Sequence, residues 1–388
     1  MTATIKTQHP FKLKWWQAAL LALPMLLLSA MMMLGPSGGG DTLQTATWLF
    51  TWALLNVFFF LMLLTGHTHR YRSILFVAVA VGFAIYFITN LIETRGSMIL
   101  TETNVIEGET PFCHLVIPMI LIPAALTQTI IFPGSLLEGF APIAGMIVLW
   151  LGVSLALGRG WCSWGCFYGG FDEGFSCLAK KARIKHIDHK WTYLPYAVLL
   201  VIVLTSALTL SPTYCEWLCP FKAVTEFAEI TSVKVLIQTI IFVTLFLGTV
   251  IVLPFLTKRR VQCGLFCPFG AMQSFLNKIN IFELRIDTEK CSKCLKCVRS
   301  CPTFSLDENS LASGKPSITC TKCGQCIDAC PKNAISYHIK GTPIGLHPNV
   351  ARVLFIYPAF LLLVVIGGGM IAGGLWRILM LITTGSMI

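Results

Sequence analysis

Long apolar stretches recur along this chain, and each is long enough to cross a membrane as a helix. A helix needs about 20 mainly apolar residues to span the hydrocarbon core of a bilayer. The stretches that meet this length are residues 15–34, 47–66, 73–92, 139–158, 191–210, 234–256 and 350–371. Only 12% of the residues are charged, about half of the roughly 25% found in soluble domains. The sequence therefore predicts an all-α integral membrane protein of about seven spans.

The charge pattern orients these spans. Lys and Arg outnumber Asp and Glu by 29 to 18, and such an excess is typical of loops that stay in the cytoplasm. The basic loops share one side only if the proline-containing segment 115–133 is re-entrant; if it crosses, everything after it inverts. We expect a multi-pass protein of the bacterial cytoplasmic membrane, with a cytoplasmic amino terminus. Retention of basic loops on the cytoplasmic side of the membrane explains the positive net charge, so nucleic acid is not an expected partner.

The spans and loops divide the chain into three regions. Residues 1–256 form a membrane domain with six spans, residues 257–345 a cytoplasmic part, and residues 346–388 a C-terminal span. The cytoplasmic part is expected to contain a small α+β ferredoxin-like insert. Because this insert has little apolar core, its folding should depend on bound metal.

Two nearly identical cysteine runs lie in the insert. Each reads C-x2-C-x2-C-x3-C-P, a run that binds [4Fe–4S] clusters in bacterial ferredoxins. Three closely spaced thiolates bind one cube, and the fourth cysteine completes the other cluster. The sequence thus assigns one cluster to Cys291, Cys294, Cys297 and Cys330, and the other to Cys320, Cys323, Cys326 and Cys301. Zinc sites are the alternative, but they use two C-x2-C pairs rather than this doubled run.

Three further cysteine pairs share a C-x3-C spacing, and each stands at the end of a predicted span. The pairs are Cys162 with Cys166, Cys215 with Cys219, and Cys263 with Cys267. Residues four apart lie on one face of a helix, so two such pairs could supply four thiolates to one cluster. The alternative is that these cysteines pack as small hydrophobic side chains. The repeated spacing favours one or two further iron–sulfur or metal sites.

The predicted topology places two of these pairs on the inner face, where they could bind one cluster close to the insert. The inner cysteines are Cys162, Cys166, Cys263 and Cys267. Cys215 and Cys219 are expected at the outer face, about 30 Å away along a 20-residue helix.

The outer pair alone supplies two thiolates. Cys113, beside His114, is also predicted on the outer face, next to the re-entrant segment. Irregular backbone is tolerated at membrane depth where it lines a site. We therefore expect a second site at the outer pair with Cys113 as an extra ligand and His114 or a non-protein group as the fourth. Otherwise the outer pair binds nothing or helps to bind a partner's cofactor; Cys177 should pack as an ordinary buried thiol.

These motifs resemble those of the membrane polyferredoxins, a family that includes the NapH, CcoG and NosR proteins. The segments that carry the resemblance run from Gly158 to Gly174, from Cys215 to Phe221 and from Cys263 to Met272, within residues 140–340. The sequence is most similar to the transmembrane and C-terminal part of NosR, without the flavin-binding domain. Phe167 follows the first pair where the family has proline.

The resemblance implies electron transfer between the quinone pool and another redox protein. We therefore expect a membrane-bound iron–sulfur protein that relays electrons from quinol to a periplasmic or membrane partner, as in nitrate or nitrous oxide respiration. Any enzymatic role would be that of a quinol dehydrogenase component, and no catalytic residue is assigned. The alternatives are a metal reductase or assembly factor of the CcoG type and a redox-responsive regulator.

Overall fold

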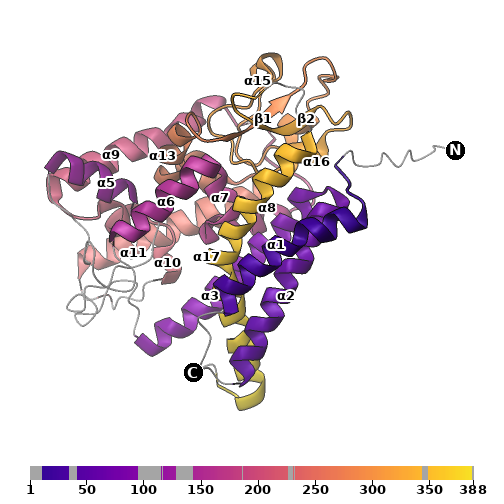
Figure 1. Ribbon diagram of the computed structural model, residues 1–388. Helices are drawn as coiled ribbons and strands as arrows, with labels where there is room; N and C mark the ends of the chain where they lie inside the picture. Colours follow the sequence, from indigo (N-terminus) through magenta and orange to yellow (C-terminus); the bar gives the residue numbers. More distant parts are fainter. Residues whose placement is uncertain are drawn as a thin grey trace.

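The computed structural model describes residues 11–34, 42–94, 115, 117–127, 143–185, 187–225, 230, 232–342 and 348–386. Long helices lie side by side, and a small sheet with short helices sits at one end of them (Figure 1). The fold is therefore mostly helical with one small mixed region, as the sequence predicts in outline.

The long helices coincide with the predicted spans. They are α1 (Trp15–Leu34), α2 (Thr42–Thr65), α3 (Thr68–Thr94), α6 (Ile143–Leu157), α9 (Leu194–Thr209), α11 (Val233–Leu245), which continues through η5 (Phe246–Val252) into α12 (Leu253–Thr257), and α17 (Pro348–Thr384). Within the described residues, six helical segments are long and apolar enough to cross a membrane. The predicted stretch 73–92 lies in α3, which is not among the six. The total of seven spans stays a prediction.

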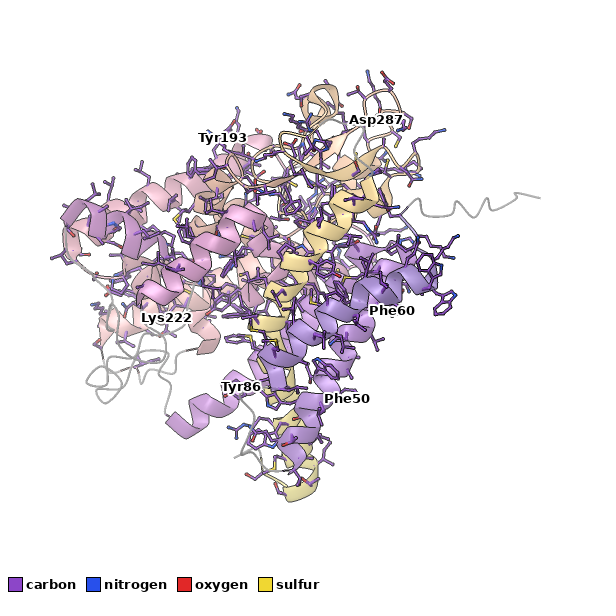
Figure 2. The ribbon with its side chains drawn as sticks, in the orientation of Figure 1. Phe50, Phe60, Tyr86, Tyr193, Lys222 and Asp287 are labelled. Carbon is purple, nitrogen blue, oxygen red and sulfur yellow. The ribbon has the colours of Figure 1, made fainter. Side chains whose placement is uncertain are left out.

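Apolar side chains point outward from these helices, as Phe50 does on α2 (Figure 2). Phe50 is 58% exposed. In the helix Val233–Thr257, only 11% of the most apolar window is buried inside the protein. So large an exposed apolar surface is unfavourable in water but favourable in contact with lipid.

Helix α17 is longer than the predicted span 350–371 and connects the two parts of the protein. Its 37 residues extend about 56 Å, which exceeds the hydrocarbon core of a bilayer. It packs against α1, α2 and α3, and its first turns pack against strand β2 of the insert. There the ring of Phe355 stacks on Tyr337 at 4.4 Å between centroids. The first turns of α17 thus provide the surface on which the insert rests.

The insert is built on one antiparallel strand pair. Strand β1 (Phe282–Ile286) pairs with β2 (Ile335–Ile339), and Phe282 lies opposite Ile339. Three short helices complete it: α14 (Lys296–Ser300), α15 (Glu308–Ser313) and α16 (Gln325–Ala329). Asp307 caps α15 by accepting a hydrogen bond from the Ser310 backbone N–H at 2.7 Å. The short elements leave most of the cysteine runs in loops.

The structure describes one helix within the proline-containing segment 115–133. Helix α5 (Ile117–Thr127) has 11 residues and extends about 16 Å, roughly half of the hydrocarbon core. It packs against α9 and against α13 (Pro268–Leu276). Cys113 and His114, the predicted extra ligands, lie outside the described residues.

Short helices and single helical turns surround the C-x3-C pairs. They are η2 (Gly158–Gly160), α7 (Trp161–Trp164), α8 (Phe167–Leu178), η3 (His189–Tyr193), η4 (Tyr214–Leu218), α10 (Lys222–Thr225), η6 (Gln262–Phe266) and α13. Each pair therefore lies where the chain ends one helical turn and starts another.

Candidate metal centres

The second cysteine of every C-x3-C pair leaves the helix. Cys166, Cys219 and Cys267 have ψ angles of 101°, 108° and 117°, which are extended conformations. The expectation that both thiols of a pair lie on one helix face is therefore wrong. Proline follows Cys219 and Cys267, and the proline ring disfavours helical backbone in the residue before it. Cys166 adopts the same conformation although Phe167 follows it.

This conformation places two of these cysteines at the start of a new helix. Cys166 is the N-cap of α8, and Cys267 is the N-cap of α13. The backbone N–H groups of Gly169 and Gly270 hydrogen-bond to the two thiols and favour the thiolate form. Helix N-termini stabilise negative charge, so the fold prepares both sulfurs to bind a positive metal centre.

The structure brings two pairs together into one group, which we call the membrane-edge set. The set consists of Cys162, Cys166, Cys263 and Cys267, all of them buried. Burial raises the pKa of Cys166 well above its ordinary value, and the neighbouring Cys162 and Cys267 thiols raise it further. Burial, followed by Cys162, raises the pKa of Cys267 to about 12. The four thiols thus share one buried environment, and the positive charge of bound iron would offset the cost of deprotonating them.

The thiols of the set are not packed around a single point. Among the described residues, no three His, Cys, Asp or Glu side chains gather closely enough to hold one metal ion. In an iron–sulfur cube each thiolate binds a different iron, so its ligands need not approach as closely as those of a lone ion. The arrangement fits a cluster in this respect.

Two buried arginines cross between the pairs of the set. Arg260 donates from Nη2 to the Cys162 carbonyl at 2.5 Å, and Arg159 donates from Nη2 to the Cys263 carbonyl at 2.7 Å. Arg260 also donates to the Cys263 Sγ at 3.2 Å. The backbone N–H of Cys263 donates to Asp172 Oδ2 at 2.8 Å. Because these contacts join segments far apart in the sequence, they fix the relative position of the two pairs.

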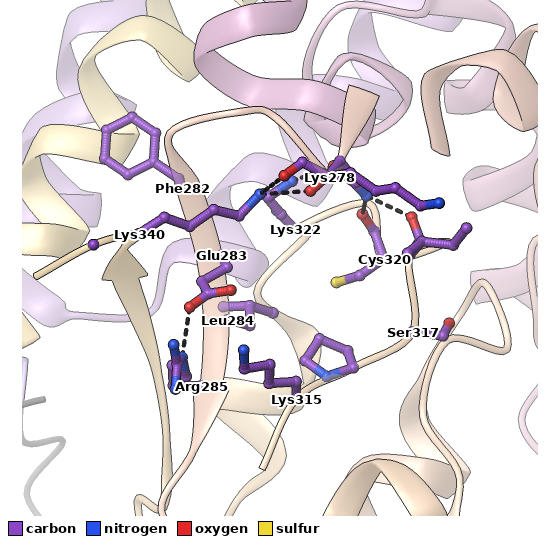
Figure 3. A pocket seen from close by; sticks show the side chains of 14 residues that line it. Lys278, Phe282, Glu283, Leu284, Arg285, Lys315, Ser317, Cys320, Lys322 and Lys340 are labelled. Carbon is purple, nitrogen blue, oxygen red and sulfur yellow. Dashed lines mark hydrogen bonds and ion pairs between the residues drawn. The ribbon is translucent and has the colours of Figure 1, made fainter. Parts of the chain in front are cut away.

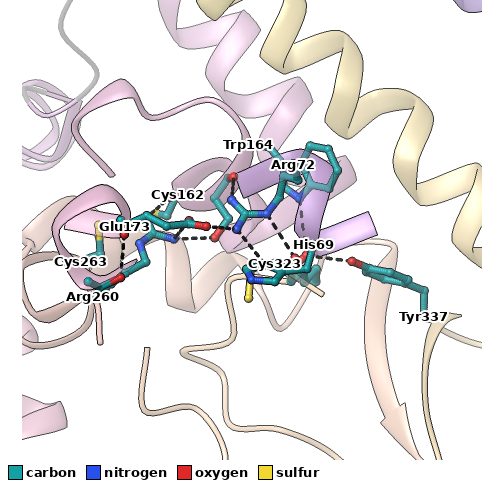
Figure 4. Close-up of polar contacts among 12 residues, drawn as sticks. His69, Arg72, Cys162, Trp164, Glu173, Arg260, Cys263, Cys323 and Tyr337 are labelled. Carbon is teal, nitrogen blue, oxygen red and sulfur yellow. Dashed lines mark hydrogen bonds and ion pairs between the residues drawn. The ribbon is translucent and has the colours of Figure 1, made fainter. Parts of the chain in front are cut away.

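A third buried arginine connects the membrane-edge set to the insert (Figure 4). Arg72 on α3 donates from Nε to the Cys323 carbonyl at 3.2 Å and from Nη1 to the Ser163 carbonyl at 2.7 Å. Its Nη2 pairs with Glu173 Oε1 at 2.5 Å. Arg260 lies 3.8 Å from the other oxygen of Glu173. One carboxylate thus holds together an arginine that touches the insert and an arginine that touches the membrane-edge set.

Glu173 is ionised in this setting. Burial alone would raise the pKa of its carboxyl, but Arg72 and Arg260 outweigh burial and lower the pKa to about 2. An unpaired buried charge would be costly, so each arginine depends on this carboxylate.

The first cysteine group of the insert lines one small cavity. Cys291, Cys294, Cys297 and Cys330 all face it. Cys330 comes from the second run, as the crosswise assignment expects. The backbone N–H of Ala334 donates to the Cys330 Sγ at 3.3 Å. Such N–H donors stabilise a thiolate, so this group has the donor chemistry that a cluster needs.

The second group of the insert is also assembled crosswise. Burial raises the pKa of Cys326 well above its usual value, and Cys323, Cys320 and Cys301 raise it further, in that order. The Cys301 Sγ accepts a hydrogen bond from the Ser305 N–H at 3.3 Å. Cys297 of the first group also contributes to the rise at Cys326, so the two groups are electrostatic neighbours.

A basic cavity of about 470 Å³ adjoins the second group (Figure 3). Its charged lining consists of Lys278, Glu283, Arg285, Lys315, Lys322 and Lys340, and Cys320 also faces it. Lys322 is buried, which lowers its pKa to about 7, while the nearby Cys320 thiol acts in the opposite direction. The cations of this cavity would lie against the negative charge of a cluster held by Cys320.

The third C-x3-C pair meets the membrane-edge region through aromatic rings. The ring of Tyr168, two residues after Cys166, stacks on Phe221, two residues after Cys219, at 4.0 Å between centroids. The two regions are therefore in side-chain contact, closer than the predicted layout on opposite faces suggests, because α8 folds back among α3 and η5. Cys219 is buried, and Cys215 is half-buried.

Cys177 differs from its prediction. It was expected to be a buried thiol, but it is exposed. Helix α8 turns Asp172, Glu173 and Ser176 toward the protein interior, and Cys177 lies outside that face.

Sequence reasoning did not find the polar contacts that hold the sites in place. The sequence analysis assigns no role to Arg72, Glu173 or Lys322, yet all three are buried. A usable signal was present at two places, because Arg159 and Arg260 each stand three residues before a C-x3-C pair. The partner of Arg72 could not be found, since Glu173 is 101 residues away.

Comparison with known proteins supports iron–sulfur chemistry in both parts of the chain. Residues 283–331 match a family described as a 4Fe-4S dicluster domain. Residues 138–185, 191–237 and 239–286 match a family described as a 4Fe-4S binding domain, so each C-x3-C pair lies in one copy of it. The three pairs are thus parts of an internal repeat.

The relatives are distant. The putative electron transport protein YccM of Escherichia coli K12 is 25% identical over 46% of this chain and 57% of its own length. The ferredoxin-type protein NapH of the same strain is 25% identical over 46% of this chain and 60% of its own length. The uncharacterized protein MJ0750 of Methanocaldococcus jannaschii is 28% identical over 46% of this chain and 71% of its own. No solved structure matches the chain. The chain thus combines 4Fe-4S domains with helices long and apolar enough to span a membrane, and it covers less than two thirds of the length of YccM and NapH.

Proposed function

We propose that this protein relays single electrons from membrane quinol to a respiratory redox partner through three [4Fe–4S] clusters. Two clusters lie in the insert, with the crosswise ligands given above, and the third is held by the membrane-edge set. Bound iron and sulfide would supply the one-electron chemistry. The protein's own residues hold the thiolates, exclude water and fix the distances between the centres.

The contact made by Arg72 carries this proposal. Its guanidinium bonds to the carbonyl of Cys323 in the insert and to the carbonyl of Ser163, which stands between the two cysteines of the first C-x3-C pair. The second insert cluster and the membrane-edge cluster would therefore be separated by little more than one side chain. A buried, hydrogen-bonded contact of this kind supports electron transfer between the two centres rather than two independent metal sites.

A branch toward the third C-x3-C pair completes the proposed path. The stacked rings of Tyr168 and Phe221 connect the membrane-edge region with the loop of Cys215 and Cys219. We propose that this pair, with Cys113 and with His114 or a non-protein ligand, holds a further metal site next to the membrane-edge region.

The orientation is also a proposal. The basic loops share one side of the membrane if segment 115–133 is re-entrant, and this charge pattern supports a cytoplasmic insert. A reporter fused after Lys340 should then behave as internal, and one fused after Glu229 as external. The reverse pattern would mean that segment 115–133 crosses the bacterial cytoplasmic membrane.

The decisive experiment is reduction of the purified full chain by a quinol analogue, followed by EPR of the clusters. We expect the analogue to reduce at least one cluster, and reduction to spread to the insert. Clusters that dithionite reduces but the quinol analogue does not would contradict the quinol relay. Reduction of Cu(II) in the same assay would instead favour a metal reductase, and a regulator would transfer electrons to neither.

A further inference from the structure

The two pairs of the membrane-edge set repeat a longer pattern than C-x3-C. In both, an arginine stands three residues before the first cysteine and a glycine stands three residues after the second. The arginines are Arg159 and Arg260, and the glycines are Gly169 and Gly270. The pattern R-x2-C-x3-C-x2-G therefore occurs twice, on either side of one set of four thiols.

The structure makes these two patterns reciprocal. Each arginine donates to the carbonyl of the first cysteine of the other pair, at 2.5 Å from Arg260 and 2.7 Å from Arg159. Each arginine also hydrogen-bonds to the thiol of the first cysteine of its own pair.

The glycines make room for this crossing. A Cβ on Gly169 would lie 2.3 Å from Arg260 Nη2, and a Cβ on Gly270 would lie 3.0 Å from Arg159 Nη2. The first distance is a clash and the second is a tight contact, so a side chain at Gly169 would displace Arg260, and one at Gly270 would press on Arg159 and shift it slightly. The arginine of one pattern and the glycine of the other thus form one matched unit.

Both guanidinium groups keep hydrogen-bonding capacity that the described residues do not use. Arg159 and Arg260 are 1% and 0% exposed. The buried Nε donors of both have no acceptor among the described residues. Buried donors without acceptors are rare and costly. The sulfide ions of a cluster held by the four thiols could accept from them.

We propose that Arg159 and Arg260 are a matched pair of positioning residues that hold positive charge against the membrane-edge cluster and thereby raise its reduction potential. This inference rests on the proposed function, because it requires a cluster at the membrane-edge set. Reduction adds one electron to the cluster, and a nearby positive charge in a dry interior stabilises the added negative charge. Hydrogen bonds from the arginines to the cysteine sulfurs act in the same direction.

The third C-x3-C pair provides an internal contrast. At the positions of the arginine and the glycine it has Pro212 and Lys222. It therefore has neither the cation before the first cysteine nor the space that a crossing arginine needs. The pattern separates the two pairs that share one centre from the pair that does not belong to it.

The test is an EPR redox titration of the purified full chain with substitutions at both arginines. The variants are Arg159→Met, Arg260→Met, Arg159→Lys and Arg260→Lys, and the control is Arg183→Met, at an exposed arginine outside the membrane-edge set and the insert. The signal lost in Cys263→Ser identifies the membrane-edge cluster. We expect each Met variant to lower the ratio of reduced to oxidised membrane-edge cluster about tenfold at fixed ambient potential, or about 59 mV for one electron. Each Lys variant should recover most of this shift, and the insert clusters should not move.

Three results would overturn the inference. Met variants that keep the parent potential would show that the charge is without effect, and equal shifts in the Met and Lys variants would show that only shape matters. Loss of the cluster from all four variants would assign the arginines to folding alone. A parent protein without any membrane-edge cluster would instead reject the proposed function, so the two failures are distinguishable.

Discussion

The insert and the membrane-edge set offer the same residue type, cysteine, as metal ligands but assemble these residues differently. In the insert, eight cysteines fall between residues 291 and 330, and their spacing already divides them into two groups. In the membrane-edge set, four cysteines come from two segments that begin about 100 residues apart, at Cys162 and Cys263. The first arrangement follows from a local sequence motif, whereas the second depends on the packing of helices and on buried charge.

This difference determines where each region is vulnerable. The insert's cysteines receive hydrogen bonds from neighbouring backbone, such as the Ala334 N–H to Cys330 and the Ser305 N–H to Cys301. The membrane-edge cysteines are held by side chains from other segments, above all Arg260. Substitutions of distant charged residues should therefore disturb the membrane-edge region and leave the insert intact.

The largest expected effect is the loss of one whole cluster. Cys263→Ser should remove about four iron atoms per protein from the membrane-edge set and leave the insert's EPR signals unchanged. Cys301→Ser should instead damage the cluster bound by Cys320, Cys323 and Cys326, although Cys301 stands nearer in sequence to the other group. Iron and sulfide analysis together with EPR of each variant measures both effects. Loss of the 291–297 cluster in Cys301→Ser would refute the crosswise assignment.

The next effect concerns the buried ion pair between the two regions. Arg72→Met leaves Glu173 without its 2.5 Å partner, and breaking a buried pair typically costs about 3–5 kcal/mol. The matched control is Arg285→Gln, which breaks an equally short pair with Glu283 at a partly exposed site and should cost less than about 1 kcal/mol. Thermal unfolding in detergent compares the two. Equal losses of stability would show that the Arg72 pair does not hold the regions together.

The sequence yielded the insert's cysteine groups and most helix positions because both depend on local patterns. Thiolate spacing and runs of apolar residues are visible without the fold. The approach of Arg72 to Cys323 depends on how α3 packs beside the insert, and no pattern encodes a contact between residues 251 apart. The extended conformation of Cys166 was missed for a related reason, since Phe167 gives no proline signal. The exposure of Cys177 depends on which face of α8 is buried. The sequence prediction for Cys177 did not take the faces of this short helix into account.

A smaller effect follows from the titration of Glu173. Its pKa is about 2 in the folded protein and about 4.5 when unfolded, so its ion pairs stabilise the fold above about pH 4.5 and are lost as pH falls toward 2. Glu173→Gln should therefore lower stability at pH 7 by on the order of 2–3 kcal/mol and lose this difference from the parent at low pH. Thermal unfolding followed by circular dichroism at a series of pH values measures the convergence. A gap that stays constant from pH 7 to pH 3 would contradict the role of the charge.

The smallest effect should come from the apolar contact between the two regions. Phe355 on α17 touches the insert through Tyr337 at 4.4 Å between ring centroids and the membrane-edge loop through Trp164 at 5.9 Å. The backbone carbonyl of Lys322 accepts hydrogen bonds from both of these partners, from Tyr337 Oη at 3.2 Å and from Trp164 Nε1 at 3.5 Å. Phe355 therefore fills the corner where insert, helix and cysteine loop meet.

Phe355→Leu keeps this corner apolar but removes the ring contacts, which are worth about 0.5–1.5 kcal/mol beyond their buried area. Stability should fall by roughly 1–2 kcal/mol, and iron content should not change, because no thiolate or charged partner is lost. Since Arg72 remains in place, magnetic coupling between the insert and membrane-edge clusters should persist in Phe355→Leu and disappear in Arg72→Met. EPR line broadening of the fully reduced proteins measures that coupling. Loss of coupling in the Phe355 variant alone would mean that aromatic packing, rather than the buried ion pair, sets the distance between the two regions.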